Sequence, residues 1–270
     1  MNLYLSNQSD KAVNAVKSNT LHINDDIELD DIVKQLREKY FLSLSSLKVI
    51  DLLSAVAKTA IGGDASFVDS WNTLEEDQYM ADGGRYRKRR HAVYKATQQA
   101  PKPRLMPYQP HYQTESYNQL NGGIERHFAP ILSDLIESPA LTALLDFGRQ
   151  LFSRMIGTSQ WHIELHQFRI EARDGQKGNP TPEGVHRDGV DFVIVVMINR
   201  VNIESGATTI YNLDNQLIGE FTLLETFDMA IVDDNKAYHG VTAIEQLEDN
   251  QEAYRDVLVI TYKKIDDNIQ

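Results

Sequence analysis

The strongest constraint on how this chain folds is a change in hydrophobic periodicity at Gly157. Before it, apolar residues recur at helical spacing; after it, short segments rich in β-branched residues alternate with turns. The segment from Phe192 to Ile198 is the longest unbroken apolar run and has the composition of a strand buried on both faces. Helices followed by a run of strands indicate a β-core with helices packed on its outside, the α+β class.

Helices are predicted in three places in the first part of the chain. An apolar stripe runs through residues 29–41, and a second begins after Ser45 or Ser46. A third starts at Ser138-Pro139, where serine suits the N-cap and proline the first helical position, and it ends at Gly157. Residues 62–125 are rich in glycine and proline, so we expect loops there, with short elements at best.

Strands are predicted at 161–172, 191–203, 208–212, 216–224, 229–232, 238–244 and 256–263. Short strands separated by turns suggest a sandwich or barrel. Because β folds of this length are often single domains, we expect one domain over residues 1–270. Its parts would be a mostly helical and loop-rich region over 1–157 and a β-core over 158–265.

The charge balance argues against nucleic acid as a partner. Lys and Arg total 27 and Asp and Glu total 39, so the formal net charge is −12, and such a chain is repelled by phosphate backbones and anionic membranes. The basic segment from Arg85 to Arg90 is the exception, and we expect it to form a solvated turn or a local anion site.

Several other classes of protein are excluded by what the sequence lacks. Without cysteine the chain has no disulfides, thiolate nucleophiles or cysteine-ligated metals. No apolar run approaches the roughly 20 residues that span a bilayer, and the N-terminal segment MNLYLSNQSDK has no signal-peptide pattern. We therefore expect a cytoplasmic protein whose oligomeric state, a homo-oligomer included, stays open.

Most of the histidines do not point to a site. His162 and His166 share one face of a predicted strand but lie roughly 13 Å apart along it, too far to chelate one ion side by side. Four others have no acidic or histidine partner at a telling spacing, and we expect them to be surface or hydrogen-bonded polar residues. These four are His22, His91, His111 and His127.

The segment His186-Arg187-Asp188 is different, because positions i and i+2 project to the same side of an extended chain. It presents an imidazole and a carboxylate together, where a Gly/Pro loop leads into the most hydrophobic strand. His239, between two late strands, supplies a third ligand. Two histidines and one carboxylate on one face of a metal leave three positions open, which is the facial triad of non-haem Fe(II) oxygenases.

Arg255 stands at the start of the last strand, which is otherwise apolar. A 2-oxo acid cosubstrate would take two of the open metal positions and O2 the third, and its far carboxylate then needs a cation. The guanidinium fork of arginine pairs with a carboxylate through two hydrogen bonds. We therefore predict that Arg255 points inward and binds 2-oxoglutarate.

The interpretation that competes with a metal site is that His186 and Asp188 only hydrogen-bond each other in a turn.

These residues lie in segments that resemble a bacterial family of Fe(II)/2-oxoglutarate dioxygenases, which includes the L-isoleucine 4-hydroxylases and related free-amino-acid hydroxylases. The resemblance extends from about residue 70 to residue 265. The segments that carry it are 121–126, 161–170, 180–192, 198–211, 238–242 and 254–261. The chain departs from the family pattern at Glu225-Thr226-Phe227-Asp228, where a Pro-Gly-Asp turn is expected.

The resemblance implies a double-stranded β-helix, the jelly-roll or cupin-like fold. It also implies that His186, Asp188 and His239 match the family's iron ligands and that Arg255 matches its 2-oxoglutarate arginine. Fe(II), 2-oxoglutarate and O2 would then be the cofactor and cosubstrates.

The substrate implied by the resemblance is a small molecule, a free aliphatic amino acid such as isoleucine, leucine or methionine. Its carboxylate would meet the Arg85–Arg90 segment or Arg169, and its ammonium would meet Glu164 or an acid within 75–82. Gln167 and Arg169 alternate on the predicted strand before the metal loop, and they are the candidate pocket residues unless they face outward.

Three alternatives stay open at this point. The chain would be a 2-oxoglutarate-dependent hydroxylase of a peptide or modified amine, a zinc or manganese cupin-like hydrolase or isomerase with the same three ligands, or a non-enzymatic binding protein with a jelly roll. An inward arginine for a dicarboxylate argues against the second, and an intact triad argues against the third.

Overall fold

The computed structural model describes residues 25–62, 65–97, 100, 102–118, 120–157, 160–173 and 175–265. His22 and the N-terminal segment behind the signal-peptide prediction lie outside the described residues. Among the helices within the described ranges, none has the length and apolar character that crossing a membrane requires.

Most helices precede the main strands in the sequence. They are α1 (Asp25–Lys39), α2 (Ser46–Ala57), α3 (Ala65–Asp69), the 3-10 turn η1 (Ser70–Thr73), α4 (Ser133–Ile136) and α5 (Pro139–Ile156). The strands are β1 (Phe41–Leu44), β2 (Glu75–Glu76), β3 (Arg87–Ala96), β4 (Arg104–Leu105), β5 (His111–Tyr112), β6 (Glu125–Arg126), β7 (Trp161–Glu171), β8 (Phe192–Val201), β9 (Ile203–Ser205), β10 (Thr208–Asn212), β11 (Leu217–Phe221), β12 (Met229–Asp233), β13 (Ala237–Val241), β14 (Ile244–Gln246) and β15 (Tyr254–Lys264).

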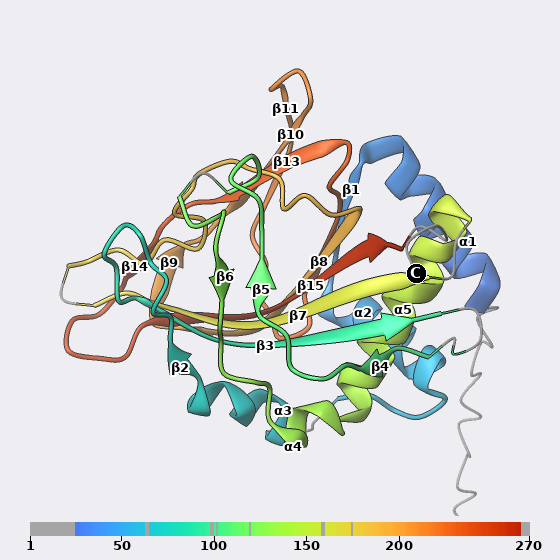
Figure 1. Ribbon diagram of the computed structural model, residues 1–270, viewed down its shortest axis with the longest axis horizontal. Helices are drawn as coiled ribbons and strands as arrows, with labels where there is room; N and C mark the ends of the chain where they lie inside the picture. The colour runs from blue at the N-terminus through green and yellow to red at the C-terminus, as the bar shows by residue number, and fades with distance from the viewer. Residues whose placement is uncertain are drawn as a thin grey trace, which may run out of the picture.

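The strands form a large and a small antiparallel sheet. The main sheet has the order β1-β12-β8-β15-β7-β3-β2, with β4 added at β3, and the smaller sheet has the order β11-β10-β13. Two short ribbons, β14-β9 and β5-β6, complete the strands of the described residues. Figure 1 shows β5, β6, β10 and β13 on one side of the main sheet and α3 and α4 on the other. The predicted jelly-roll core with helices outside it is confirmed.

Alternate side chains of the main sheet point into two different environments. On β15, Leu258, Ile260 and Tyr262 join the core that the sheet forms with the helices. Val257 and Val259 point to the opposite side, toward the smaller sheet. Strand β8 is buried on both faces, as its composition predicts, with only Val195 of its apolar run half-buried. The main sheet therefore has one face for the core and one face for a site.

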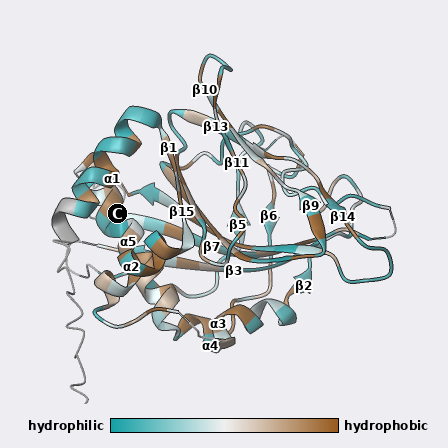
Figure 2. Ribbon diagram, turned by 180° about the vertical axis from the view of Figure 1, so that it is seen from behind, coloured by the Kyte–Doolittle hydropathy of each residue, from teal (hydrophilic) through white to brown (hydrophobic). Residues whose placement is uncertain are grey.

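The helical layer packs on the core face mainly through α5. Ser138 caps this helix by accepting hydrogen bonds from the backbone N–H groups of Ala140 and Leu141, and Gly157 ends it in the left-handed conformation. The ring of Phe152 stacks on Phe192 of β8 at 4.3 Å. Helices α1 and α2 belong to the same hydrophobic cluster as α5 and the sheet. Figure 2 shows the resulting pattern, with hydrophobic colour on α2 and the main strands and hydrophilic colour on outer loops.

Two strands appear where the sequence predicted none. Residues 87–96 form the full-length strand β3, although loops with short elements were predicted there. Its basic side chains hide the strand pattern, and Arg87, Arg89 and Arg90 are paired with the acids Asp77 and Glu75 near strand β2. Residues 41–44 form β1 rather than the end of the first helix, because Tyr40 has a positive φ of 67° and breaks the helix before the chain pairs with β12.

In the turn at Glu225–Asp228, Phe227 holds a backbone conformation that favours glycine, the residue that the family pattern predicts in this turn. Phe227 holds a φ of 73°, the left-handed region that glycine adopts without strain. The carboxylate of Asp228 stabilises the turn by accepting hydrogen bonds from the backbone N–H groups of Leu224 and Glu225. The Phe227 ring stacks on Phe67 of α3 with centroids 5.6 Å apart. The packing of the Phe227 ring against α3 therefore helps to offset the cost of its left-handed backbone conformation.

The contact between α5 and β15 generates a stability prediction. A Cβ atom on Gly148 would lie 2.4 Å from the hydroxyl of Tyr262, a buried ring whose hydroxyl donates to the Leu145 carbonyl. Gly148→Ala should therefore lower the free energy of unfolding by roughly 1–3 kcal/mol from overpacking, despite the better helix propensity of alanine. Urea unfolding measures the change, and the exposed Thr142→Ala on the same helix is the control. A Gly148→Ala protein as stable as the wild type would contradict the close packing.

Candidate active site

His186, Asp188 and His239 come together at the mouth of the space between the two sheets. His186 and Asp188 lie in the segment before β8, and His239 lies on β13. The backbone N–H of His186 donates to the carbonyl of His239 and the reverse bond is also made, both at 2.9 Å. This isolated bridge fixes the two imidazole rings with their centroids 4.6 Å apart.

The side-chain geometry fits a single metal ion. Nε2 of His186 lies 3.5 Å from one Asp188 oxygen, and Nε2 of His239 lies 3.6 Å from the other. One ligand atom from each residue falls within 4.8 Å of the other two. His186 Nδ1 donates to the Gly184 carbonyl at 3.0 Å, which directs Nε2 toward the other two ligands. Two imidazoles and one carboxylate in this arrangement are suited to Fe(II).

The loop that carries Asp188 is fixed by a residue that the sequence analysis missed. The buried carboxylate of Asp234 accepts hydrogen bonds from the backbone N–H groups of Asp188, Gly189 and Val190, at 2.8 to 3.2 Å. Gly189 has a φ of 81°, which turns the chain toward β8. Asp234 follows β12 in an Asp-Asp-Asn turn, and no motif in the sequence separates it from its acidic neighbour.

Burial and mutual contact give the three ligand residues different charge states. Burial opposes a charged ring, but the hydrogen bond to Asp188 and the charges of Asp188 and Glu183 raise the pKa of His186 to about 9. Burial and the neighbouring His186 lower the pKa of His239 to about 4. Burial acts against ionisation of Asp188, yet its hydrogen bond to His186 and the nearby imidazoles lower its pKa to about 2. At neutral pH His186 therefore holds a proton, Asp188 is ionised and His239 is neutral, so the charges of the first two residues offset each other.

A narrow cavity of about 130 Å³ connects these residues with Arg255, since all four line it. The Arg255 side chain is buried, and its Nε has no hydrogen-bond partner among the described residues. Burial and the charge of Arg200 lower its pKa to about 10. A buried guanidinium whose Nε has no hydrogen-bond partner within the described ranges fits a site that receives an anion. The apolar walls from Val193, Val195 and Val257 suit the methylene groups of a short dicarboxylate.

A wider cavity of about 480 Å³ adjoins the first. The two share the residues Arg87, Phe168, Glu183, Asp188 and Val259. The wider cavity therefore reaches the proposed metal ligands through Asp188, and it has the size of a small-molecule site. Its lining carries both signs of charge, with Arg89, Arg126 and Lys263 against Glu164 and Glu183.

The structure does not bring Gln167 and Arg169 to this site, which corrects their placement in the pocket. Both lie on the core face of β7, because the face that reaches the cavities belongs to the alternate residues His166 and Phe168. Gln167 donates to the hydroxyl of Ser70. Arg169 forms a two-point hydrogen bond with buried Asp256, at 2.7 and 2.8 Å.

The Arg85–Arg90 segment is mostly buried, so the predicted solvated turn is wrong. Arg87 donates to Asp77 at 2.8 Å, and Arg89 lies 3.7 Å from the same carboxylate. Arg90 points to the other side and donates to two backbone carbonyls. The predicted local anion site survives only in Arg87 and Arg89, because these two side chains line the wider cavity.

Two of the histidines are hydrogen-bonded polar residues, as expected, but they belong to a group that sequence spacing did not reveal. Strands β3, β5 and β7 bring His91 and His111 beside Glu164 and His166. Sequence spacing gives no sign of this group, since its members come from three strands. His127 is exposed, as expected.

Comparison with known proteins places the chain in a family. The sequence profile described as 2OG-Fe dioxygenase matches residues 68–261. The chain therefore belongs to the 2OG-Fe dioxygenase family, whose chemistry uses Fe(II), 2-oxoglutarate and O2.

Two named proteins are similar in sequence to this chain. The chain is 29% identical over 162 residues to a 3(1)-hydroxy-L-isoleucine 4-dioxygenase of Pantoea ananatis, covering 58% of this chain and 65% of the relative. It is 26% identical over 198 residues to an L-isoleucine-4-hydroxylase of Bacillus thuringiensis, covering 72% of this chain and 80% of the relative. The match thus spans slightly less than two thirds of the first relative's length.

A solved structure supports the fold assignment over nearly the whole chain. A bsmA homologue from Methylobium petroleophilum PM1 superposes with a TM-score of 0.77 and 34% sequence identity, covering 87% of this chain and 93% of that one. The jelly-roll architecture and the family assignment therefore agree.

The hydrogen bonds of Asp234 generate a prediction about metal binding. Asp234→Asn replaces one acceptor oxygen by an NH2 group that faces backbone N–H donors, which should loosen the Asp188 loop. The affinity for Fe(II) should fall about 10- to 100-fold. Anaerobic calorimetric titration measures it, with Asp233→Asn as the matched control. Equal affinities for the wild type and Asp234→Asn would contradict the positioning role.

The raised pKa of His186 predicts that metal binding depends on pH. Below about pH 9 the free protein holds a proton on this ring, and the proton must leave when a metal binds. Metal affinity should therefore fall about tenfold for each pH unit below about 9. Titration with Mn(II) in buffers of different ionisation enthalpy counts the released proton. An affinity that does not change between about pH 7 and 8.5 would contradict this assignment.

Proposed function

We propose that the chain is an Fe(II)/2-oxoglutarate-dependent dioxygenase that hydroxylates an unactivated side-chain carbon of a free aliphatic amino acid, of the isoleucine, leucine or methionine type. The observation that carries the proposal is one cavity lined by His186, Asp188, His239 and Arg255, whose Nε has no hydrogen-bond partner in the part of the chain that the structure describes. The printed names of the two relatives, an isoleucine hydroxylase and a hydroxy-isoleucine dioxygenase, support the substrate class.

His186, Asp188 and His239 would hold the iron in this proposal. Bound Fe(II) with O2 would supply the oxidation, in which 2-oxoglutarate loses CO2 to give succinate, one oxygen atom enters succinate and the other enters a substrate C–H bond. The protein itself fixes the ligands through the His186–His239 bridge and Asp234. Apolar side chains from both sheets, such as Val195 and Val241, line the cavity around them.

Arg255 would bind the far carboxylate of 2-oxoglutarate. Arg255 on β15 lies in register with Arg200 on β8, so positive charge is concentrated at this end of the cavity. The Arg255 Nε has no hydrogen-bond partner within the described chain. A carboxylate there gains charge-assisted hydrogen bonds in a buried setting. A hydrolase or isomerase with the same three ligands would have no use for this group.

The amino-acid head group would bind in the wider cavity. The Glu183 Oε2 and Arg126 Nε atoms are buried without hydrogen-bond partners among the described residues, and both side chains line this cavity. Glu183 suits an ammonium group, and Arg126 suits a carboxylate. Glu164, the acid that the sequence suggested for the ammonium, has His162 at one oxygen and His111 at the other. Glu183 is therefore the better candidate.

Product analysis with a panel of free amino acids tests the proposal. The wild-type protein with Fe(II), 2-oxoglutarate and O2 should give a product one oxygen atom heavier from an aliphatic amino acid, together with an equal amount of succinate. Asp188→Ala should abolish both signals, and the exposed turn substitution Asp214→Ala should leave them unchanged. Turnover only on a peptide or modified amine would overturn the substrate class but not the oxygenase assignment, whereas full succinate release by Asp188→Ala would overturn both.

Arg255 gives a second, independent prediction. Arg255→Gln removes the charge from a buried carboxylate site, so the KM for 2-oxoglutarate should rise on the order of a hundredfold, the loss of about two charge-assisted hydrogen bonds. Affinity for Fe(II) should not change. The exposed Arg173→Gln serves as the control. An unchanged KM in Arg255→Gln would show that 2-oxoglutarate is held elsewhere.

A further inference from the structure

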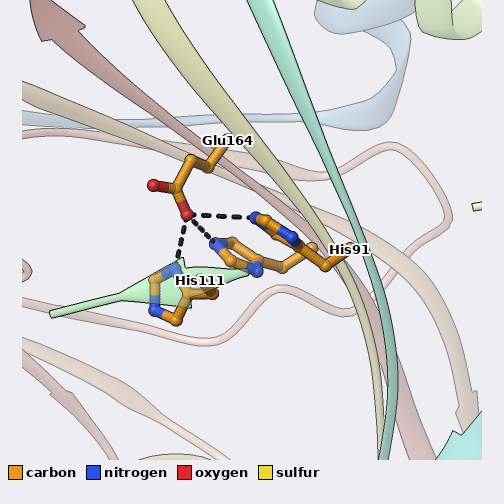
Figure 3. Close-up of side chains that lie close together, drawn as sticks. His91, His111 and Glu164 are labelled. Carbon is orange, nitrogen blue, oxygen red and sulfur yellow. Dashed lines mark hydrogen bonds and ion pairs between the residues drawn. The ribbon is translucent and has the colours of Figure 1, made fainter. Parts of the chain in front are cut away.

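A second group of metal-type ligands lies apart from the His186–Asp188–His239 site. His91 on β3, His111 on β5 and Glu164 on β7 point toward one another, and we call them the Glu164 cluster. Figure 3 shows nitrogen atoms of both imidazoles directed at one carboxylate oxygen. His166 stands beside them, and one ligand atom from each of these four residues lies within 4.8 Å of the others.

The interatomic distances fit coordination to one ion. Glu164 Oε2 lies 3.1 Å from His91 Nε2 and 2.5 Å from His111 Nδ1. Ligand atoms bound to zinc at about 2.0–2.1 Å in a tetrahedron are separated by roughly 3.3 Å. Small side-chain adjustments would therefore bring these three atoms around one ion.

The cluster gathers its imidazoles around one carboxylate oxygen. His91 and His111 lie within hydrogen-bond distance of Glu164 Oε2, and His166 Nε2 lies 3.6 Å from the same oxygen, beyond hydrogen-bond distance. The two hydrogen bonds use the two lone pairs of that oxygen, so the third imidazole is only close to it. A cation among the rings would use the carboxylate and two imidazole lone pairs together.

The state of the rings suits metal binding and decides which of them would be ligands. Burial lowers the pKa of His111 to about 4 and lowers the pKa of His91, so both rings are neutral at neutral pH. Arg89 donates to His166 Nδ1 at 2.7 Å, so the proton of neutral His166 sits on Nε2, the atom that faces Glu164. His166 is thus blocked as a ligand while this bond lasts.

The charges around the cluster are partly balanced. Arg89 is a cation beside the cluster, because it is hydrogen-bonded to His166. It is stacked 3.7 Å from the Phe128 ring and lies 3.7 Å from the buried carboxylate of Asp77. Asp77 offsets the charge of Arg89, and Glu164 itself keeps its negative charge because the imidazoles hold its pKa well below the usual range against the effect of burial. A divalent ion would meet one full negative charge at the site.

We propose that His91 Nε2, His111 Nδ1 and Glu164 Oε2 form a second metal site, which takes a divalent transition ion of the zinc type. Two imidazoles and one carboxylate favour such an ion over Mg(II) or Ca(II), which prefer all-oxygen sites. Three protein ligands leave a fourth position open. His111, Glu164 and His166 line the wider cavity, so the open position faces the space that we assign to substrate.

Metal stoichiometry tests this site separately from the iron site. At about pH 7.5, zinc titration of the full chain should give two ions per wild-type chain and one per Asp188→Ala chain. In the Asp188→Ala background, Glu164→Gln or His111→Gln should lower the remaining affinity at least a hundredfold. The exposed His127→Gln should leave it unchanged. Circular dichroism and the thermal midpoint confirm that each variant is folded, and the two cluster variants act through different strands.

Co(II) substitution supplies a second readout that does not depend on activity. The Asp188→Ala protein should show visible d–d absorption of a low-coordinate cobalt ion, which zinc displaces, and Glu164→Gln should abolish it. Zinc-edge anomalous diffraction should place the ion between His91, His111 and Glu164. An Asp188→Ala protein that binds no zinc with micromolar or better affinity would overturn the proposal. Binding that survives both cluster substitutions would also overturn it.

Discussion

The alternation of side chains along β7, β8 and β15 is the constraint on which the rest of the structure depends. Because each strand has two faces with period two, one set of residues must complete the helix-packed core while the other set faces the smaller sheet. Tyr262 and Arg255 illustrate the two sets on one strand, the first buried against α5 and the second in the cavity that reaches the metal ligands. A one-residue register shift would exchange these roles, so the core holds the active-site residues in place.

The buried charges on the cavity face explain why this surface suits anionic and zwitterionic ligands. Arg87 and Arg89 share Asp77, while Arg255 and Arg126 keep nitrogen atoms without partners among the described residues. Such atoms are costly in an apolar interior unless a ligand satisfies them. The overall negative charge of the chain would have obscured this local excess of cations, which is why net charge limits partners only in the broad sense.

The sequence predicted those parts of the site that depend on local spacing. His186 and Asp188 are two residues apart in an extended segment, and the apolar, β-branched composition of the following segment predicts strand β8. The two ligands and the strand could therefore be found without a structure. Gln167 and Arg169 were misplaced because alternation shows which residues share a face but not which face points to the metal. Asp234 and the Glu164 cluster were missed because their partners come from distant segments. Strand β3 was missed because four basic residues in a row resemble a solvated surface, whereas pairing with Asp77 and Glu75 lets its arginines be buried.

The most direct measurement of the central claim is an anaerobic titration of the Fe(II)-loaded protein with 2-oxoglutarate, followed by visible absorption. Chelation of the metal by the 2-oxo acid produces a metal-to-ligand charge-transfer band. If His186, Asp188 and His239 leave adjacent positions open and Arg255 holds the far carboxylate, the band should saturate at one 2-oxoglutarate per chain, and pyruvate, which lacks that carboxylate, should bind far more weakly. No band at saturating 2-oxoglutarate, or equal affinity for pyruvate, would contradict the account.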